Sequence, residues 1–318
     1  MKIKSRQIHA QIRVQGEFFR AISPLGSEKI QRILSPVSGK ALSLLSLKHL
    51  HCKKISIMRK NGSAMRICVF DSQVKNGSKV GILWLHGGGY SLGAPEMAAM
   101  SFPRHLLKNF NCVIVSPDYT LSAKSEYPAS FNDACSALEW MLEHKQILGF
   151  EGEKIVVGGE SAGGGLAAAL AIYARDKGKN CFGFQIPLYP MLDDRVTRTS
   201  ADNDAPVWNT KSNKSAWKIY LGDRVMNLSV PVYAAPARET NFSNIPPVLS
   251  AVGTIDPFYA EDILFFGNIE KSGAEVKCFV AEGGFHAFDM LAPYTKISRS
   301  AVEFMLAAFG EYIDKYLD

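Results

Sequence analysis

The sequence contains few cysteines and no long apolar run, and both shortages limit what the protein can be. Six cysteines in 318 residues, with no CxxC pair, suit neither a disulfide scaffold nor a zinc site, so we expect reduced thiols and no bound metal. The longest apolar stretch without a charge in its middle, residues 161–174, is shorter than the roughly 18 to 20 residues that cross a bilayer, so no membrane span is predicted. No apolar signal-peptide segment follows the basic amino terminus, and we expect a cytoplasmic protein.

Positive charge is concentrated at one end of a chain whose composition is otherwise that of an ordinary globular protein, with 47% hydrophobic and 21% charged residues. Residues 1–60 contain 13 Lys/Arg and two acidic residues, a balance of +11, whereas the remainder has 23 and 28, a balance of −5. We interpret the scattered basic residues as the solvated face of an amphipathic helix and expect no nucleic-acid partner. An arm that binds nucleic acid or anionic lipid is the alternative. The basic residues lie singly between Ile8, Ile12, Phe18, Phe19 and Ile22.

Strand-like and helix-like segments alternate along most of the chain. Two runs of alternating polarity meet at Asn61-Gly62, a strong signal for a β-hairpin. From Lys79 onward, short runs are apolar throughout, as expected of parallel strands that are buried on both faces. These runs are VGILWLH, CVIVSPDY, KIVVGGE, FGFQIPLY, PPVLSAVGT and VKCFVAE. Helical patterns lie between several of them, so we predict an α/β fold with a mostly parallel central sheet flanked by helices.

Two parts of the chain do not fit this alternation, and we predict that they form a helical cap. Residues 1–50 contain a helix expected to stop at Pro36 and a second helical piece over residues 39–47. The interval after Leu188 is too long for a simple connection, which indicates a helical insertion at about 190–225. Residues 51–318, apart from that insertion, would form the catalytic domain.

A G-x-S-x-G pentapeptide, Gly159-Glu160-Ser161-Ala162-Gly163, lies directly between a predicted strand and a predicted helix. A serine on such a turn must adopt a strained backbone, and the flanking glycines remove side chains that would clash there. Its hydroxyl would then project beside the positive end of the helix, which suits a nucleophile. The alternative is a glycine-rich turn whose serine only caps the helix.

A second glycine-rich segment, His86-Gly87-Gly88-Gly89-Tyr90, follows the predicted strand GILWL. Three glycines allow backbone N–H groups to converge on one point, as the stabilisation of an oxyanion requires, and we expect His86 to hold this loop. Phosphate binding is the alternative. However, neither segment has P-loop spacing, and the first strand carries no G-x-G-x-x-G fingerprint.

A nucleophilic serine needs a base, and the base needs an acid that orients it. His286 follows the predicted strand VKCFV, and Asp256 follows the predicted strand PPVLSAV. Both therefore lie at carboxyl ends of strands, where an open α/β sheet has its ligand site. The chain order Ser161, Asp256, His286 is the order known for this type of sheet. The histidines expected to be poorer candidates are His9, His49, His51, His105 and His144.

Together these segments resemble the hormone-sensitive-lipase-like esterases of the α/β-hydrolase superfamily. The blocks HGGGY, GESAGG, DYTLSAKSEYPAS, GTIDPFYAED and GFHAF occur in the family's order between Lys79 and the carboxyl terminus. The resemblance implies an α/β-hydrolase fold with Ser161 as nucleophile, Asp256 as orienting acid and His286 as base. It also implies that the oxyanion hole consists of the N–H groups of Gly88, Gly89 and Ala162.

Two positions depart from that family's pattern. Glu160 stands where the family usually has Asp, a change that we expect to keep the charge. The run DYTLSAK replaces the more usual DYRLAPE, which removes an arginine and an acid and leaves Lys124 beside the predicted site.

The expected function is hydrolysis of small carboxylic esters through an acyl-enzyme intermediate, without a metal ion or organic cofactor. The partners would be a small-molecule ester and, in a homodimer, a second copy of the chain. The same residues could hydrolyse amides or lactones. A non-catalytic small-ligand receptor of this fold is an alternative from another class, but such receptors lack the histidine that is present here as His286.

Overall fold

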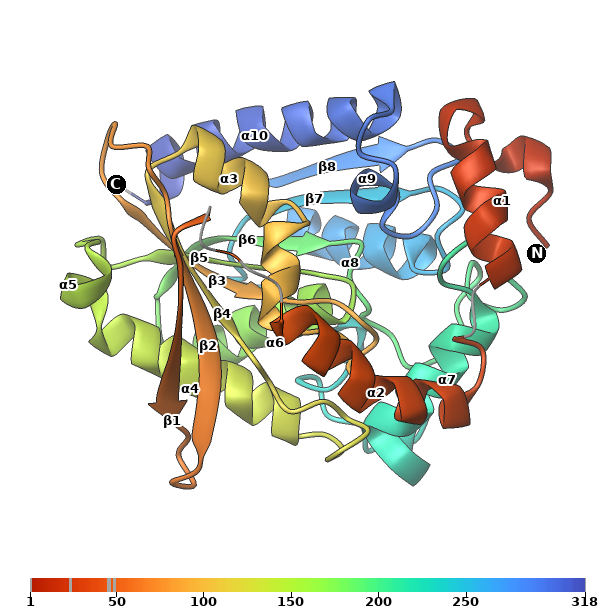
Figure 1. Ribbon diagram of the computed structural model, residues 1–318, viewed down its shortest axis with the longest axis horizontal. Helices are drawn as coiled ribbons and strands as arrows, with labels where there is room; N and C mark the ends of the chain where they lie inside the picture. The colour runs from red at the N-terminus through yellow and green to blue at the C-terminus, as the bar shows by residue number, and fades with distance from the viewer. Residues whose placement is uncertain (1, 23–24, 45–46, 48–49, 318) are drawn as a thin grey trace.

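A single sheet of eight strands runs through the computed structural model, which describes residues 2–22, 25–44, 47 and 50–317 (Figure 1). The strands are β1 (Cys52–Met58), β2 (Ala64–Asp71), β3 (Val80–Leu85), β4 (Cys112–Pro117), β5 (Ile155–Glu160), β6 (Phe182–Leu188), β7 (Val248–Gly253) and β8 (Val276–Ala281). Their order across the sheet is β1-β2-β4-β3-β5-β6-β7-β8. Only the pairs β1–β2 and β2–β4 are antiparallel, which confirms the predicted α/β fold with a mostly parallel sheet.

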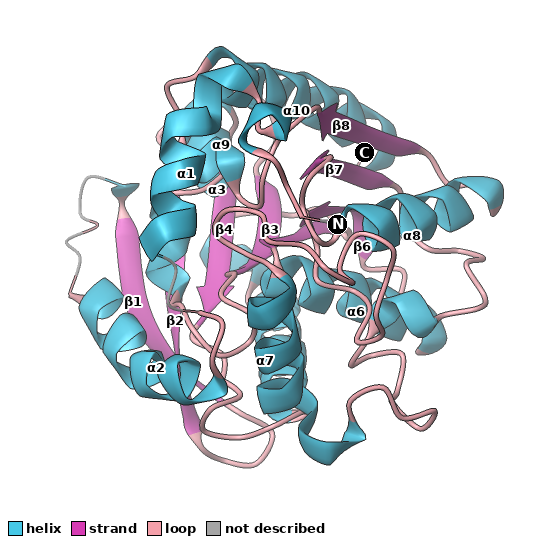
Figure 2. Cartoon of the chain, turned by 90° about the vertical axis from the view of Figure 1, so that its right-hand side faces the viewer, coloured by secondary structure: helices cyan, strands magenta, loops and turns pink. Residues whose placement is uncertain are grey.

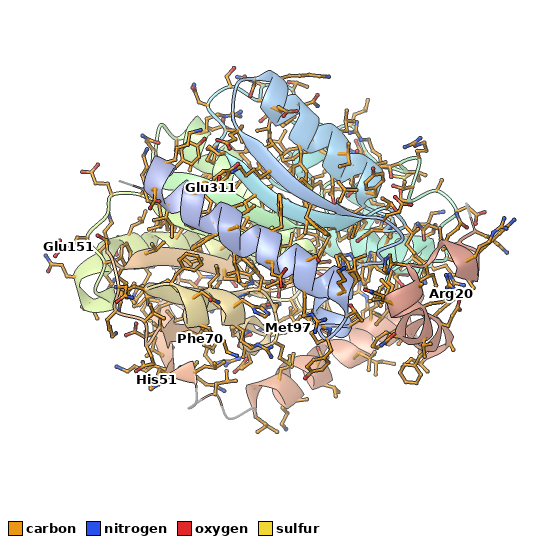
Figure 3. All side chains as sticks on the ribbon, turned by 90° about the horizontal axis from the view of Figure 1, so that it is seen from above. Arg20, His51, Phe70, Met97, Glu151 and Glu311 are labelled. Atoms are coloured by element: carbon orange, nitrogen blue, oxygen red, sulfur yellow. The ribbon has the colours of Figure 1, made fainter. Side chains whose placement is uncertain are left out.

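Helices lie on both faces of the sheet. The α-helices are α1 (Arg13–Ile22), α2 (Glu28–Ser43), α3 (Pro103–Asn109), α4 (Ala129–Glu143), α5 (Lys145–Leu148), α6 (Ala162–Asp176), α7 (Thr210–Leu221), α8 (Tyr259–Lys271), α9 (Phe288–Leu291) and α10 (Lys296–Tyr316). Short 3-10 helices are η1 (Ser5–Gln7), η2 (Ala10–Ile12), η4 (Pro95–Ala99), η5 (Gly222–Arg224) and η6 (Pro236–Arg238). The view from above in Figure 3 shows α10, which carries the labelled Glu311, running along the sheet.

Strands β3 to β7 are largely apolar because side chains on both of their faces are buried, whereas β8, at the edge of the sheet, is only partly buried. On β3, Leu83 and Leu85 pack into the cluster that includes residues of α4 and α6. Ile82 and Trp84 point the other way, into the cluster that includes residues of α3 and α10. Full burial of such a side chain contributes roughly 1.5 to 3 kcal/mol to folding, so β3 is fixed from both sides.

The predicted hairpin is present. β1 and β2 pair antiparallel up to Met58 and Ala64, and the connecting loop contains Gly62 at φ +79°. Asn61 supports the turn because its side-chain oxygen accepts a hydrogen bond from the Ser63 N–H at 3.0 Å.

The prediction that Pro36 stops a helix is wrong. α2 continues through Pro36 and joins most of the two predicted helical pieces into one; residues 45–46 of the second piece lie outside the described residues. A proline in a helix removes one hydrogen bond and crowds the preceding turn, at a cost of about 3 kcal/mol. Contacts on both sides of the proline hold the helix. Gln31 donates to the carbonyl of Ser212 at 3.2 Å, and the Gly93 N–H donates to the Ser38 hydroxyl at 3.3 Å.

The amino-terminal segment and α7 lie at the end of the sheet toward which β7 and β8 point (Figure 1). The segment is attached there by backbone and side-chain contacts: the His9 N–H donates to the Gly283 carbonyl at 3.0 Å, and the Ile3 N–H to Asp204 at 2.6 Å. Ile8 and Ile12 are fully buried at this contact. The start of the chain and α7, which belong to the two segments predicted to form a cap, therefore lie near the carboxyl ends of β7 and β8.

Candidate active site

Ser161 occupies the sharp turn between β5 and α6. Its backbone is at φ +56° and ψ −120°, a conformation that a non-glycine residue rarely adopts. The flanking glycines permit the close approach that the turn requires. A Cβ atom on Gly159 would overlap the carbonyl of Gly163, and one on Gly163 would overlap the carbonyl of Leu85. The sequence therefore builds a strand-to-helix turn that exposes the Ser161 hydroxyl to the carboxyl edge of the sheet.

The structure brings Ser161, His286 and Asp256 into one hydrogen-bonded chain, although they are far apart in the sequence. His286 Nε2 lies 2.9 Å from Ser161 Oγ, and His286 Nδ1 lies 2.7 Å from Asp256 Oδ2. The other oxygen of Asp256 accepts a hydrogen bond from the Phe258 N–H at 2.9 Å. Ser161, His286 and Asp256 are 5%, 4% and 0% exposed, so these hydrogen bonds are shielded from water. With its proton on Nδ1, His286 can accept the serine proton at Nε2.

The loop from His86 to Tyr90 lies directly beside Ser161. Gly88 and Gly89 adopt φ +114° and +59°, and an ideal Cβ on Gly87 would lie 3.4 Å from the Cβ of Ser161. Among the described residues, the N–H groups of Gly88, Gly89 and Ala162 donate to no protein acceptor. Unpaired donors next to the serine oxygen are what a developing oxyanion needs.

His86 lies behind this loop and not at the reacting atoms. Its Nδ1 is 2.8 Å from the Gly87 carbonyl oxygen, and its ring stacks on Tyr119 with the centroids 4.0 Å apart. The Tyr119 hydroxyl donates to the His86 carbonyl at 2.8 Å. Complete burial lowers the pKa of His86 to about 4, so the imidazole is neutral at neutral pH and holds the loop without adding charge.

The charge of Glu160, the residue before the serine, differs from the one expected from the sequence. Its side chain is buried and accepts a hydrogen bond from Trp84 Nε1. Burial raises the pKa of Glu160 to about 8, so the carboxyl group is mostly protonated at neutral pH. The expectation that this position keeps a negative charge fails because burial removes water from the carboxyl group and no cation among the described residues pairs with it.

Three aromatic residues that the sequence argument did not assign to the site surround His286. The ring centroids of Tyr189, Phe258 and Trp208 lie 5.0, 5.2 and 6.1 Å from that of the imidazole. Trp208 also reaches Gly89, where an ideal Cβ would lie 2.5 Å from the indole. The predicted insertion thus places a buried indole over both the base and the glycine loop. The available signal was the pair of tryptophans, Trp208 and Trp217, in the predicted insertion.

The DYTLSAK segment retains an ionic contact despite its departures. Asp118 pairs with Arg66 of β2 at 2.9 Å, and Arg66 also pairs with the buried Glu96. At the position of the arginine that the segment lacks, Thr120 accepts a hydrogen bond from Arg59 Nη2 at 3.5 Å. Lys124 is exposed and has no acidic partner among the described residues.

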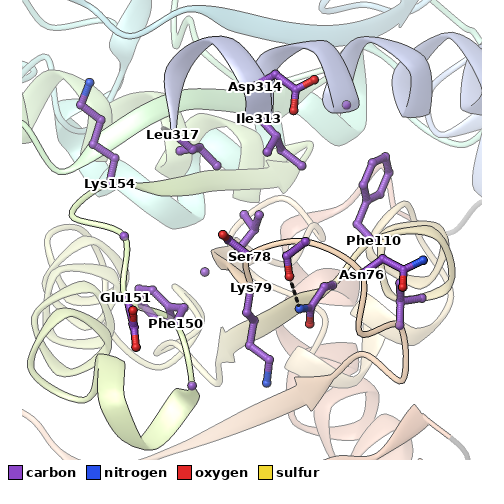
Figure 4. Close-up of a pocket in the computed structure, with 18 of the residues that line it drawn as sticks. Asn76, Ser78, Lys79, Phe110, Phe150, Glu151, Lys154, Ile313, Asp314 and Leu317 are labelled. Carbon is purple, nitrogen blue, oxygen red and sulfur yellow. Dashed lines mark hydrogen bonds between the residues drawn. The ribbon is translucent and has the colours of Figure 1, made fainter.

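The remaining candidates lie elsewhere. His9, His51, His105 and His144 make no hydrogen bond with Ser161, and His49 lies outside the described residues. Within the described ranges, no cluster of three metal-ligating side chains is present, and no helix has the length and apolar character to cross a membrane. A cavity of about 820 Å³ lies at the opposite edge of the sheet, near Lys79 and Lys154, and contacts none of the three hydrogen-bonded residues (Figure 4).

Comparison with known proteins gives concordant matches. The profile of a family described by the alpha/beta hydrolase fold matches residues 82–290. Esterase LipI of Mycobacterium tuberculosis is 30% identical over 209 residues, which cover 65% of each chain. Carboxylesterase NlhH of the same organism is 29% identical over 200 residues, 62% of each chain. These alignments thus span slightly less than two thirds of either relative.

Solved structures match over nearly the whole chain. A bacterial heroin esterase superposes with a TM-score of 0.84 at 27% identity, covering 98% of this chain and 99% of the other. An esterase of Pyrobaculum calidifontis gives a TM-score of 0.75 at 25% identity, with 99% and 97% covered. The likeness therefore extends to the amino-terminal segment, which lies outside the residues matched by the family profile, as well as to the insertion, which lies within them.

Proposed function

The chain belongs to the hormone-sensitive-lipase-like esterases of the α/β-hydrolase fold family, and on that premise we propose that it hydrolyses carboxylic esters by covalent catalysis at Ser161. The observation that carries the proposal is the chain of hydrogen bonds from Ser161 through His286 to Asp256, at 2.9 and 2.7 Å. A serine hydroxyl is a weak nucleophile until a neighbouring base removes its proton.

In the proposed acylation step, His286 Nε2 takes the proton of Ser161 as the serine oxygen attacks the ester carbonyl. The carbonyl oxygen becomes an oxyanion that accepts hydrogen bonds from the N–H groups of Gly88, Gly89 and Ala162. Collapse of this intermediate releases the alcohol, which takes the proton from His286, and leaves the acyl group on Ser161. Asp256 stabilises the imidazolium that exists between these two transfers.

Deacylation repeats the sequence with water. His286 removes a proton from the water as it attacks the acyl carbon, and the same N–H groups stabilise the second oxyanion. Proton return to the serine oxygen releases the carboxylic acid and restores the enzyme. Every step uses protein groups and water, so we propose that no metal ion or organic cofactor takes part.

The surroundings of His286 support a short acyl group. Trp208, Tyr189 and Phe258 enclose the imidazole, and all three are buried. We assign residues 1–50 and about 190–225 to a cap, because the first segment contacts Gly283 and the second places Trp208 on Gly89. A non-catalytic receptor is disfavoured because His286 lies within hydrogen-bond distance of Ser161.

A fluorophosphonate probe tests this proposal directly. We expect one mass increment on the peptide that contains Ser161. Ser161→Ala should abolish labelling and lower kcat for p-nitrophenyl acetate by roughly 10⁴ to 10⁶, because only the oxyanion hole and binding would remain. Ser122→Ala is the matched control, since Ser122 is also buried but lies outside the hydrogen-bonded chain. Labelling at another serine, or a tenth of the activity in Ser161→Ala, would exclude the assignment.

A further inference from the structure

Helix α2 presents its apolar side to solvent and its polar side to the protein. Ile33, Val37 and Leu44 are 59%, 58% and 79% exposed, and with Ile30 they form one stripe along the helix. The opposite face carries Gln31, which is fully buried and donates to the carbonyls of Leu25 and Ser212. A helix at the surface of a soluble protein normally has the reverse arrangement.

Helix α1 has a second exposed apolar stripe. Val14, Phe18 and Ile22 are 80%, 59% and 54% exposed and follow one another at intervals of four residues. The other side of α1 faces the protein, where Gly16 packs against Phe285. The prediction that the apolar residues of this segment face inward therefore holds for Ile8 and Ile12 but fails for Phe18 and Ile22. We call the exposed set the cap stripe: Val14, Phe18, Ile22, Ile30, Ile33, Val37 and Leu44.

Both helices lie on the same side of the molecule, at the left in Figure 2. Arg20 of α1 lies at the outer edge of the protein in Figure 3. The cap stripe belongs to the segment that carries +11 of charge, while the rest of the chain carries −5. The segment with the exposed apolar side chains is therefore also the one with the excess of basic residues, although Lys54, Arg59 and Lys60 within it are paired with carboxylates.

Next to α2 the surface is hollowed. A cavity of about 580 Å³ lies between the helix, β2 and the loop after β4, and is lined in part by Arg32 and Lys124. Among the described residues neither of these two cations has an acidic partner. The cavity is also lined by Arg59 and Arg66, but both of these cations are in ion pairs. Arg59 pairs with Asp133, and Arg66 pairs with Glu96 and Asp118. The cavity can therefore accept an anionic group without breaking an ion pair.

We propose that this face docks on a lipid surface that carries anionic headgroups. The cap stripe would enter the boundary between headgroups and acyl chains, as amphipathic helices with basic flanks do, and Arg32 and Lys124 would contact lipid phosphates. A second copy of the chain fits less well, because a symmetric contact would bring two strongly basic segments together. Nucleic acid would leave the apolar stripe without a partner. The proposal does not depend on the ester chemistry.

Flotation of the full chain with vesicles tests it. We expect binding to vesicles that contain phosphatidylglycerol, weakening with added salt, and little binding to phosphatidylcholine alone. The double variant Ile33→Ser/Val37→Ser should lower binding by about tenfold or more, since two exposed apolar side chains no longer enter the lipid. Ile147→Ser is the matched control. Ile147 is 81% exposed but lies on α5, far from α1 and α2 in Figure 1.

The charge contribution is tested separately with Arg32→Gln/Lys124→Gln, which should weaken binding and flatten its salt dependence. Lys271→Gln, at an exposed position on α8, is its control. All variants should keep wild-type circular dichroism, so that a change in vesicle binding does not come from unfolding.

The proposal is overturned if the wild-type chain ignores anionic vesicles, if it binds neutral vesicles equally well, or if the cap-stripe variant binds like Ile147→Ser. It is also overturned if sedimentation shows that Ile33→Ser/Val37→Ser dissociates a dimer that does not bind lipid, since a second copy would then cover this face.

Discussion

Replacing Asp256 by Asn should disable the proposed base by changing its tautomer. Oδ1 of Asp256 accepts the Phe258 N–H at 2.9 Å, and Oδ2 accepts from His286 Nδ1 at 2.7 Å. The single oxygen of an asparagine will stay on the Phe258 N–H, because an amide NH₂ there would oppose another donor. The NH₂ group then faces His286 Nδ1, so the imidazole must carry its proton on Nε2.

A proton on Nε2 prevents His286 from accepting the proton of Ser161, 2.9 Å away. An asparagine in this position of a serine triad lowers kcat by about 10⁴, which corresponds to about 5 kcal/mol of transition-state stabilisation. We therefore expect the Asp256→Asn variant to lose about four orders of magnitude in kcat on p-nitrophenyl acetate, with KM little changed. Steady-state kinetics on protein that is shown to be folded by circular dichroism measures this.

Asp262 offers a matched control one turn and a half farther along the chain. It is as fully buried as Asp256, and burial raises the pKa of its carboxyl well above the ordinary value. Neither of its oxygens has a hydrogen-bond partner among the described residues. Asp262→Asn exchanges one group for another of the same shape at a position outside the hydrogen-bonded chain of Ser161, His286 and Asp256, so kcat should stay within about tenfold of wild type. The reasoning fails if Asp256→Asn keeps more than a tenth of the activity, or if Asp262→Asn loses as much.

Three further perturbations test other parts of the site. Trp208→Ala removes the indole beside Gly89 and His286, so kcat/KM should rise for p-nitrophenyl hexanoate relative to acetate; an unchanged ratio would show that Trp208 does not limit acyl length. The pKa of Glu160 rises from 4.5 to about 8 on folding, so between these values the free energy of unfolding should fall with rising pH, by up to about 1.4 kcal/mol per unit. Glu160→Gln should reduce this slope in urea denaturation, and an identical slope would contradict the assignment. EDTA should leave the rate unchanged, whereas a loss that a divalent metal restores would reveal a metal site.

The sheet was predictable because its strands satisfy a local rule. Strands buried on both faces must be apolar throughout, and each of the six predicted runs contains one of the strands from β3 to β8. The hairpin was predictable for a similar reason, since Gly62 takes the positive φ for which glycine is preferred. Pro36 was misleading because the tendency of proline to end a helix is opposed here by long-range contacts, such as the hydrogen bond from Gln31 to Ser212. The spacing of residues in the sequence does not reveal such contacts.

The candidate site likewise contains residues that the sequence predicts and residues whose positions depend on long-range contacts. Ser161, Asp256 and His286 lie within five residues of the ends of β5, β7 and β8, so the topology of a parallel sheet brings them to one edge before any detail of packing is known. Trp208 reaches the same edge from an irregular insertion, and its path depends on tertiary contacts. The neutral state of Glu160 also depends on the surrounding packing, since it results from the water that burial removes.

The outward-facing stripe of α2 shows a further limit of periodicity. A pattern of apolar residues three and four apart identifies an amphipathic helix, but it does not state which side meets the protein. The usual assumption is that the apolar side faces the protein, and it holds when the outer side of the helix contacts only water. In α2 that assumption fails because Gln31 finds carbonyl partners inside, which leaves Ile33 and Val37 on the surface. A helix reversed in this way exposes apolar area to water, and such an area is the kind of surface that an apolar partner would cover.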